Sequence, residues 1–252
     1  MHNLLEIKNI EKTFYTLSGE VQAIKNVSFN VYDNEFLCIV GSSGCGKSTL
    51  LNIIAGLLNY NGTISFSKKD PIIGYMLQED ALLPYLNILD NATLGLSIKK
   101  IKTNENVNYV KKLLETYGLK DFIYKYPSSL SGGMKQRVAL IRTLAIKPDL
   151  LLLDEPFSAL DYQSRLKVSD DVYNIIKKEK KTVIMITHDI GEAISLSDKI
   201  IVLSKRPAVV KKIYDINFEN KSSPINNRTE KEFSIYYDKI WRDLDEMWSK
   251  SN

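Results

Sequence analysis

A glycine-rich loop from Gly41 to Ser48 has the residue types that can hold a phosphate group. It reads Gly-Ser-Ser-Gly-Cys-Gly-Lys-Ser, with four residues between Gly41 and the run Gly46-Lys47-Ser48. The glycines let backbone N–H groups turn toward phosphate oxygens at dihedral angles that a Cβ would resist. Lys47 can reach the β- and γ-phosphates of a nucleotide, and the Ser48 hydroxyl can ligate Mg²⁺. The loop therefore predicts a nucleotide site.

A strand and a helix must flank this loop if it is to work, and both are predicted. Glu35–Val40 is almost continuously apolar and ends directly in the loop, while Ser48–Leu58 repeats its apolar residues on one helical face. The N-terminus of that helix would direct its partial positive charge at the bound anion. The residues expected to contact the nucleotide here are Gly41, Ser42, Ser43, Gly44, Cys45, Gly46, Lys47, Ser48 and Thr49.

Two adjacent carboxylates follow a second apolar strand. Leu150–Leu153 is four leucines in a row, and Asp154 and Glu155 come directly after them. In open α/β sheets ligands bind at the carboxyl ends of the strands, where Asp154 would hold Mg²⁺ directly or through water. We predict that Glu155 is the base that polarises the attacking water, with a metal between the carboxylates and the phosphate. In the alternative interpretation, Glu155 only caps a turn or pairs with a lysine.

The wider pattern predicts a parallel sheet with helices on both faces. Apolar strands are predicted at Leu150–Leu153, Thr182–Thr187 and Lys199–Leu203, with an amphipathic helix at Ser164–Lys178. Further short strands are predicted in the first third of the chain, and helices from Asp80 to Pro127. The other predicted elements are strands at Leu4–Ile10, Ala23–Tyr32, Thr63–Phe66 and Ile72–Leu77, a helix at Met134–Ile146, an exposed connection at Lys99–Asn108, a loose polar segment at Asn217–Pro224 and a helix at Glu230–Trp248.

The composition of the 252 residues is ordinary for a soluble globular protein, with 44% apolar and 25% charged residues. The net charge of +4 is a mild excess that is more typical of a solvated surface than of an anionic partner. A disulfide between Cys38 and Cys45 would stiffen the phosphate loop, so reduced thiols and a cytosolic compartment are predicted. We expect no membrane span and no signal peptide, since no run approaches the length of about eighteen apolar residues that a span needs.

The octapeptide Leu130–Arg137, Leu-Ser-Gly-Gly-Met-Lys-Gln-Arg, resembles the signature sequence of the ATP-binding cassette (ABC) proteins. In that family the signature of one subunit covers the ATP that another subunit holds. The signature residues matched here are Ser131, Gly132, Gly133 and Gln136. The resemblance implies a head-to-tail pair of two copies with two ATP molecules between them.

Other family motifs extend this resemblance over nearly the whole chain. Gln78 matches the Q-loop glutamine, which touches Mg²⁺ and reports to the transmembrane partner, and Pro156–Asp161 matches the D-loop. His188 matches the switch histidine that contacts the γ-phosphate, although a lone histidine after an apolar strand is often only structural. The aromatic residue that stacks on adenine would be Phe14 or the adjacent Tyr15, and Phe14 aligns better by spacing.

The resemblance implies an α/β fold, that of a P-loop NTPase with a RecA-like parallel-sheet core, an N-terminal antiparallel β subdomain and an inserted helical subdomain. Residues 1–225 would form the ATP-binding domain, with the helical subdomain at about 80–145, and residues 226–252 a C-terminal helical tail. ATP and Mg²⁺ are the implied cofactors. The implied catalytic residues are Lys47, Glu155 and His188, and the implied metal ligands are Ser48, Gln78 and Asp154.

Two stretches narrow the resemblance to importers of the nitrate/sulfonate/taurine type. Leu83-Pro84-Tyr85 with Asn91–Leu96 is similar to a pattern of that group, in which a Trp often stands at the position of Tyr85. Ser204–Pro207, followed by a short strand and an aromatic C-terminal helix, fits the same group. Thiamine-precursor and bicarbonate importers share the pattern, so the cargo stays open. The alternatives are the ATPase of an exporter or a lipoprotein-release complex, and a non-transport ABC ATPase.

This resemblance implies a peripheral subunit on the cytoplasmic side of a membrane. Its partners would be a second copy of itself, transmembrane permease subunits and, indirectly, a solute-binding protein, with no nucleic acid. Leu82, Leu83, Pro84 and Tyr85 would form an exposed apolar patch that receives a coupling helix of the permease. Alternatively, these four residues pack inside the helical subdomain.

Overall fold

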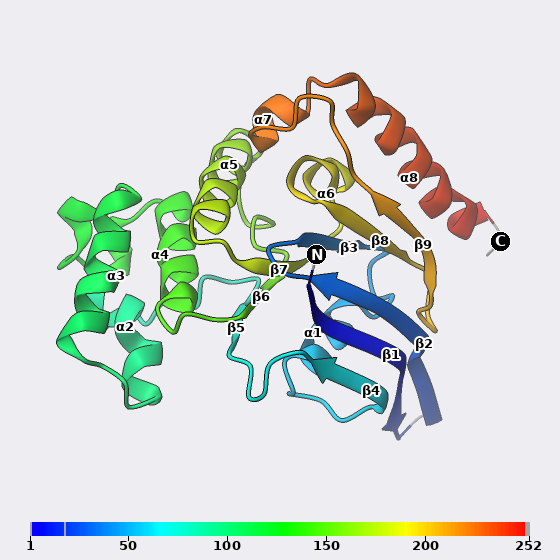
Figure 1. Cartoon of the computed structure of the whole chain (residues 1–252), viewed down its shortest axis with the longest axis horizontal. Helices are drawn as coiled ribbons and strands as arrows, with labels where there is room; N and C mark the ends of the chain where they lie inside the picture. Colours follow the sequence, from blue (N-terminus) through cyan, green and yellow to red (C-terminus); the bar gives the residue numbers. More distant parts are fainter. Residues whose placement is uncertain (1, 18, 250–252) are drawn as a thin grey trace. The chain divides into compact units, whose positions relative to one another are not determined.

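The computed structural model describes residues 2–17 and 19–249, which form two compact units (Figure 1). The first unit is built from the two ends of the chain, up to Pro71 and from Thr182 onward. The second unit is the continuous segment Ile72–Lys181. Within the described residues, no helix combines the length and the apolar character that crossing a membrane would require.

An antiparallel sheet forms the N-terminal part of the first unit. Its strands are β1 (Asn3–Thr16), β2 (Gly19–Tyr32) and β4 (Asn61–Phe66), in the order β2-β1-β4. The three predicted strands are confirmed but longer. The β1–β2 ladder continues past several register shifts to pair Phe14 with Val21, and the β1–β4 ladder extends to the pair Glu11 and Asn61. The predicted N-terminal antiparallel subdomain is therefore present.

A parallel arrangement around β3 (Phe36–Val40) forms the core of the first unit. β3 pairs in parallel with β7 (Thr182–Thr187) and with β8 (Lys199–Leu203), and β9 (Val210–Asp215) joins β8 antiparallel. All five residues of β3 are buried. Since β3, β7 and β8 run the same way, the loops that follow them meet at one edge.

The helix after the phosphate loop is shorter than the sequence pattern predicted. This helix, α1, spans Lys47–Ile54, whereas the periodicity predicted Ser48–Leu58. Gly56 adopts a φ of +74°, and the Leu57 N–H donates to the Asn52 carbonyl at 2.9 Å, a left-handed glycine cap that ends the helix. Leu57, which the pattern placed on the buried face, is therefore 65% exposed.

The second unit pairs two strands and adds helices. β5 (Ile73–Met76) runs parallel to β6 (Leu150–Asp154), which confirms the predicted strand at the carboxylates. Its helices are α2 (Ile88–Ile98), α3 (Asn104–Thr116), α4 (Gly132–Leu144) and α5 (Tyr162–Lys178), with 3₁₀ turns at Lys120–Phe122 and Pro127–Ser129. Because the Thr103 side chain caps α3, the predicted exposed connection extends only to that residue.

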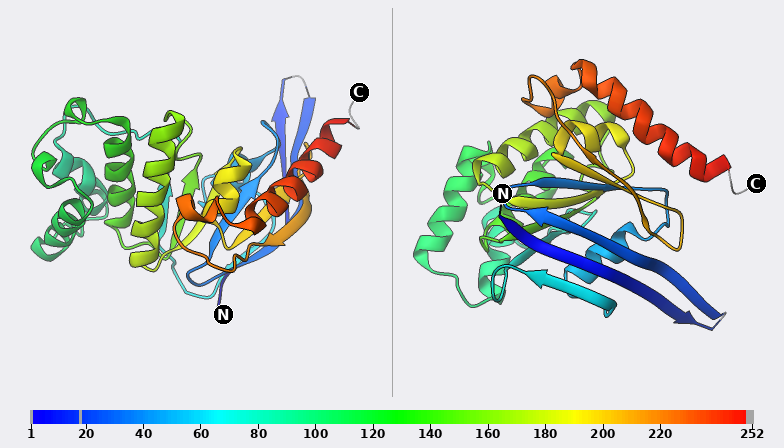
Figure 2. Two further views of the ribbon diagram at one scale, coloured as in Figure 1. Left: turned by 90° about the horizontal axis from the view of Figure 1, so that it is seen from above. Right: turned by 45° about the vertical axis from the view of Figure 1, so that its right-hand side comes forward.

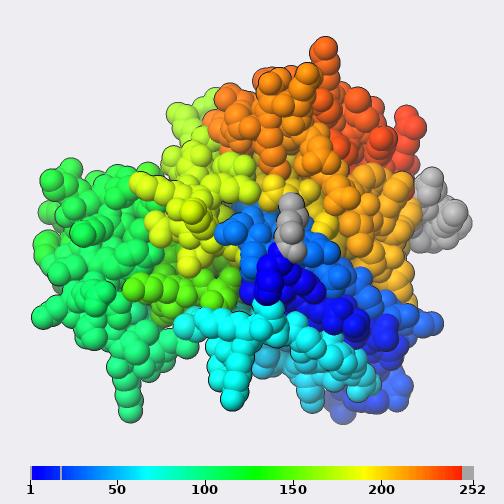
Figure 3. Space-filling model, in the orientation of Figure 1, coloured from blue at the N-terminus to red at the C-terminus, as the bar shows by residue number. Residues whose placement is uncertain are grey.

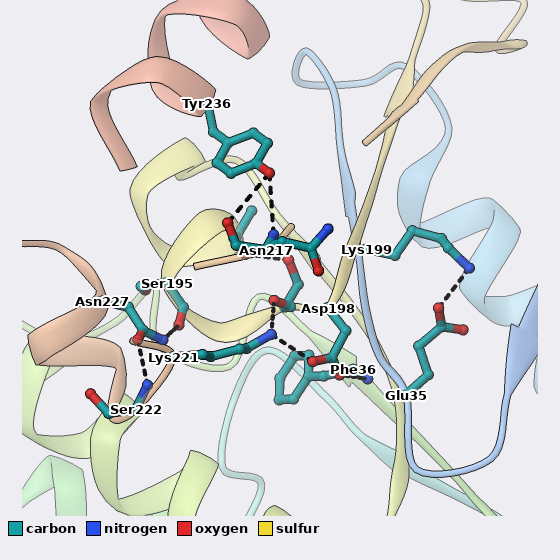
Figure 4. Close-up of polar contacts among 12 residues, drawn as sticks. Glu35, Phe36, Ser195, Asp198, Lys199, Asn217, Lys221, Ser222, Asn227 and Tyr236 are labelled. Carbon is teal, nitrogen blue, oxygen red and sulfur yellow. Dashed lines mark hydrogen bonds and ion pairs between the residues drawn. The ribbon is translucent and has the colours of Figure 1, made fainter. Parts of the chain in front are cut away.

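The C-terminal part of the first unit contains α6 (Ile190–Leu196), α7 (Pro224–Asn227) and α8 (Lys231–Ser249). The segment Asn217–Pro224 is held in place by hydrogen bonds and a ring contact, so the prediction that it forms a loose connection was wrong. Lys221 Nζ donates to Asp198 Oδ1 at 2.6 Å, and the Asn227 side chain donates to the Ser195 carbonyl at 2.9 Å (Figure 4). Buried Phe218 also meets the ring of Tyr236 edge to face. The side views show α8 running along the outside of this unit (Figure 2).

Candidate nucleotide site

The phosphate loop leaves the carboxyl end of β3 in a conformation that needs glycine at two positions. Gly44 has a φ of +73° and Gly46 a φ of +120°, both in the left-handed region that a Cβ resists. Gly46 stands at the N-cap of α1, and its carbonyl accepts from the Leu50 N–H at 2.9 Å. The loop thus brings the positive end of α1 to the place where a phosphate would bind.

Lys47 is held by its own loop. Its side chain is buried, with 6% of the residue exposed, and Nζ donates to the Gly41 carbonyl at 2.8 Å and to the Ser42 carbonyl at 3.1 Å. A buried ammonium needs such partners, and a phosphate entering the loop can replace both carbonyls as the stronger, charged acceptor. Ser48 is exposed, Thr49 half-buried and Cys45 buried, and Cys38 and Cys45 are free thiols as predicted.

His188 lies at the same sheet edge as the loop. It follows β7 directly, and it lines a cavity of about 290 Å³ with Gly41, Ser42 and Ser43. Ile190 of α6 and three residues of α8, Trp241, Leu244 and Asp245, complete the lining. The structure therefore brings the predicted switch histidine to the phosphate loop, and it adds a wall from α8 that the sequence did not indicate.

The turn that carries His188 is fixed by one buried and two partly buried hydrogen bonds. The Thr187 hydroxyl donates to Glu192 Oε2 at 2.8 Å and accepts from the Asp189 N–H at 3.0 Å. Asp189 caps α6 by accepting from the Glu192 N–H at 2.9 Å. His188 is exposed between these anchors, so its imidazole can meet a ligand without disturbing the fold.

The two candidate aromatic residues for adenine line another cavity of the first unit, of about 560 Å³. Phe14 is half-buried, and Lys12 Nζ lies 5.1 Å from its ring centroid and 2.7 Å from Asn59 Oδ1. Tyr15 is 78% exposed. Phe14 is the better-held platform for stacking, since Lys12 and the strand fix the orientation of its ring.

In the second unit, Asp154 ends β6 and accepts a hydrogen bond from Tyr75. The hydroxyl of Tyr75 lies 3.2 Å from Asp154 Oδ2. Burial, with the charge of Asp154, raises the pKa of Tyr75 well above its usual range, so the phenol stays a donor. Sequence reasoning missed Tyr75, although β5 and β6 pair in parallel with Tyr75 opposite Leu152, close to the end of β6.

Gln78 and Glu155 are linked through Ser158. Gln78 Nε2 donates to Ser158 Oγ at 3.2 Å, and Ser158 Oγ donates to the Glu155 carbonyl at 3.0 Å. Glu155 adopts a φ of +44°, an uncommon conformation for a residue with a Cβ. The Ser158 N–H also donates to the Glu155 carbonyl, which helps to hold that conformation. Gln78, the predicted Q-loop glutamine, and Glu155, the predicted base, thus belong to one hydrogen-bonded group.

The signature begins α4. Ser131 is the N-cap and accepts from the Met134 N–H at 3.4 Å, and both Ser131 and Gly132 are exposed. A Cβ on Gly133 would lie 2.6 Å from Val168 of α5, so this glycine is also required for helix packing. Gln136 is buried, and its Oε1 has no hydrogen-bond partner among the described residues. The exposed cap leaves the helix N-terminus open to an anion.

The turn between β8 and β9 adds a contact that the sequence did not predict. Arg206 Nη2 and Nε donate to the Gly44 carbonyl at 2.8 Å and 3.2 Å. Lys205 and Arg206 line a shallow cavity with the loop residues Ser42, Ser43, Gly44 and Cys45. The Arg206 guanidinium, on the turn between β8 and β9, therefore holds the phosphate loop at Gly44.

We expect Arg206→Ala to raise the KM for ATP about fivefold while kcat changes little, because the guanidinium preorganises the loop for ATP by about 1 kcal/mol and supports the bound ground state and the transition state equally. Steady-state ATPase assays measure both constants. Arg242→Ala, which removes an exposed arginine from α8, is the control. An unchanged KM in Arg206→Ala would show that the loop holds its shape without the guanidinium.

Asn91 organises the segment that was predicted to meet a permease. Its amide donates to the carbonyls of Leu83, Leu86 and Asn87 at 2.9–3.1 Å, and its Oδ1 accepts from the Leu83 N–H at 2.7 Å. Pro84 and Tyr85 are exposed, the latter at 72%. Leu83 is only half-buried, but Leu82 is buried, so the prediction was wrong to include Leu82 in the exposed patch.

Asn91→Ala should lower the free energy of unfolding by about 2–4 kcal/mol, because it removes the four partly buried hydrogen bonds that the Asn91 side chain makes to the main chain of the segment 83–87. Urea unfolding followed by circular dichroism measures the change. Asn174→Ala provides the matched control, since this exposed asparagine makes one long hydrogen bond, 3.4 Å, to Asp170. Equal stability of the two variants would contradict the role assigned to Asn91 in holding the segment 83–87.

The described residues thus form two partial sites. The first unit brings together the phosphate loop and His188, with Phe14 in a separate cavity. The second unit connects Gln78 with Glu155 and carries the signature on α4. Both sets have the chemistry expected of a site for a nucleoside triphosphate: amides, a lysine, a histidine and carboxylates.

Comparison with known proteins agrees with this chemistry. Residues 24–158 match the family described as ABC transporter. An uncharacterised ABC transporter ATP-binding protein of Bacillus subtilis, YtlC, is 40% identical over 252 residues, with 97% of each chain covered. The nitrate import ATP-binding protein NrtD of Synechocystis is 37% identical over 94% of this chain and 93% of its own length. The aliphatic sulfonates import protein SsuB of Bacillus anthracis is 38% identical, with 94% of each chain covered.

A solved structure shows the same fold. It is the ATP-binding cassette MJ0796, a dimer in a post-hydrolysis state bound to ADP and phosphate, with a TM-score of 0.69. The two are 31% identical, and the match covers 85% of this chain and 99% of that one. The phosphate loop, the exposed signature cap and these matches together show that the chain belongs to the ABC transporter family, as an ATP-hydrolysing cassette.

Proposed function

We propose that this chain is the ATPase subunit that powers solute import through a membrane transporter of the nitrate/sulfonate/taurine type. The observation that carries the proposal is that one chain has both a phosphate loop with His188 beside it and an exposed signature cap on α4. The names of the nitrate and sulfonate relatives support import, as does the stretch Leu83–Tyr85 held by Asn91. The subunit would lie on the cytoplasmic side of the membrane, with residues 1–225 as its ATP-binding domain and 226–252 as a tail.

ATP binding would begin at the phosphate loop. Lys47 would leave the carbonyls of Gly41 and Ser42 for the β- and γ-phosphates, and the loop amides would take up the remaining oxygens. Phe14 would stack on adenine and His188 would contact the γ-phosphate. These residues orient the nucleotide, so the phosphate to be transferred is held from both sides before any water attacks.

The donor set fits Mg²⁺, since a hydroxyl, an amide oxygen and a carboxylate are the oxygen ligands that this ion prefers. Ser48, Gln78 and Asp154 would hold it, and Tyr75 would orient the Asp154 carboxylate. When bound, the ion neutralises charge on the phosphates. Glu155 would accept a proton from the attacking water, and the Ser158 contact with its main chain would fix its position.

Dimerisation of two copies of the chain would complete the nucleotide site. Ser131, Gly132, Gly133 and Gln136 of a second copy would cover the ATP held by the first, in a head-to-tail dimer. ATP binds the closed pair better than the open one, and hydrolysis removes the γ-phosphate that both copies hold, so the pair reopens. This is the means by which the cassette would drive a permease between two states.

The exposed residues Pro84 and Tyr85 are the proposed contact with the permease. Tyr85→Ala should leave the ATPase activity of the isolated cassette unchanged and reduce solute-stimulated activity of the complex at least about tenfold, because a buried aromatic anchor often contributes 2 kcal/mol or more. Tyr124→Ala, a similarly exposed tyrosine of the second unit, is the control. Equal solute-stimulated ATPase activity in the two variants would show that the permease contacts another surface.

The cargo would be set by the permease and the solute-binding protein. The test of the proposed function is to purify the complex with its permease in vesicles and to measure which solute, nitrate, an alkyl sulfonate, taurine or a thiamine precursor, stimulates ATP hydrolysis and accumulates inside. ATP-driven loss of a solute from cells would instead favour the exporter alternative. Failure of the chain to assemble with any permease, with ATP hydrolysis that no solute stimulates, would favour a non-transport ATPase.

A further inference from the structure

One face of α8 carries three stacked aromatic rings, Phe233, Tyr237 and Trp241, here called the aromatic ladder. Successive rings are 6.3 Å apart between centroids, with interplanar angles of 27° and 9°. Tyr237 is 37% exposed and Trp241 is 54% exposed. The space-filling view shows the C-terminal segment, in orange and red, at the surface (Figure 3). Rings stacked in this way along a surface form an apolar strip that is typical of an interface.

The aromatic ladder leads to the phosphate loop. Trp241, its last ring, lines the cavity of about 290 Å³ that also contains His188 and the loop residues Gly41, Ser42 and Ser43. Leu244 and Asp245, in the next turn of α8, line the same cavity. The exposed rings and the face of the phosphate loop are therefore one continuous surface of the first unit.

Several contacts anchor α8 at this place. Ile240 is fully buried, and α8 packs against α6 and β8. Asp243 accepts hydrogen bonds from the hydroxyl of Tyr214, through its carboxylate, and from Lys211, through its main-chain carbonyl. A helix held by a buried apolar side chain and by charged hydrogen bonds behaves as a fixed part of the unit, so α8 forms a wall of the loop cavity and does not act as a lid over it.

We propose that the aromatic ladder is part of the surface that a second copy of this chain covers when ATP closes the pair. This inference rests on the head-to-tail pairing proposed above. A copy that reaches the γ-phosphate side of the loop must approach the face on which Trp241 lies, because Trp241 and the loop line one cavity. Since α8 is fixed there, the approaching copy meets the rings of Tyr237 and Trp241 and removes them from water.

The first test measures ATP-dependent dimerisation in the Glu155→Gln background by analytical ultracentrifugation. Tyr237→Ala and Trp241→Ala should each weaken the dimer about tenfold or more, which corresponds to about 1.4 kcal/mol. Ile235→Ala is the matched control, because Ile235 is 50% exposed and points away from the ladder on the same helix. Dimers of wild-type strength in both ladder variants would overturn the inference.

Two further outcomes separate the possible failures. If Glu155→Gln alone forms no dimer with ATP, the proposed pairing fails and the interface fails with it. If Trp241→Ala weakens ATP binding to the monomer as much as it weakens the dimer, Trp241 acts on the nucleotide site of its own chain. That result would overturn the inference. ATP affinity measured at protein concentrations far below the dimer dissociation constant gives this comparison.

Fluorescence provides an independent measurement, because Trp241 and Trp248 are the two tryptophans of the chain. In a Glu155→Gln, Trp248→Phe variant, Trp241 is the single reporter. Its emission should shift to shorter wavelength with ATP only at protein concentrations at which the dimer forms, and ADP should give no shift. A shift that appears at every protein concentration, or dimerisation without any shift, would contradict burial of Trp241 by a second copy.

Discussion

Replacing Glu155 by Gln is expected to reduce the rate of ATP hydrolysis at least about 100-fold, since a general base commonly contributes a factor of 10² to 10⁴. The amide keeps the size of the side chain and can still hold the water, but it cannot take the proton. ATP binding at Lys47 should persist, so the variant should accumulate as an ATP-bound dimer. Phosphate-release assays and analytical ultracentrifugation measure the two effects.

The control for this variant is Glu115→Gln, which alters an exposed glutamate of α3 in the same unit and should hydrolyse ATP at the normal rate. Circular dichroism should show the same fold for both variants, because neither change removes a buried apolar side chain. A Glu155→Gln protein that stays monomeric and turns over normally would rule out both the assigned base and the proposed pairing.

Lys47→Ala should weaken ATP binding about 100-fold, which corresponds to about 2.7 kcal/mol. The ammonium is buried and prepositioned on the carbonyls of Gly41 and Ser42, so the phosphates gain a desolvated positive charge that no other side chain of the loop can replace. Isothermal titration calorimetry with ATP in the Glu155→Gln background measures the affinity without hydrolysis.

Lys8→Ala is the matched control, since Lys8 is an exposed lysine of the same unit with an ion pair to Glu6. This variant should bind ATP as the parent protein does. The Lys47→Ala protein should also keep its thermal unfolding transition within a few degrees, because the hydrogen bonds of the Lys47 ammonium go to two main-chain carbonyls of its own loop and join no other element. ATP affinity within threefold of the parent would contradict the role assigned to Lys47.

The elements that hold the site could be predicted because their patterns are local. Continuous apolar runs indicated β3, β6 and β7, and the phosphate loop carries its own glycine and lysine spacing. Helix ends were less accurate, as with α1, because a glycine cap decides the last turn and periodicity does not show it. The free cysteines were also predicted correctly.

The hydrogen bonds that hold the site residues in position could not be predicted, because they join residues that are distant in the sequence. Arg206 and Gly44 lie 162 positions apart, and Gln78 and Ser158 lie 80 positions apart. Each contact depends on how strands are ordered in space, and the types of these side chains do not specify a partner. Leu82 was misplaced for a similar reason, since Asn91 turns the segment so that Leu82 is buried.

The insertion of the second unit between the two halves of the first has a consequence for synthesis on the ribosome. β3 is made early, but both of its neighbours, β7 and β8, come after residue 181. At usual elongation rates, roughly 10–30 s separate the emergence of β3 from that of β8. The second unit is continuous in sequence and can fold during this interval. Over the same time β3, with its five apolar residues, remains unpaired at both edges. Until β7 and β8 are translated, β3 of the nascent chain is therefore open to pairing with the strands of other chains.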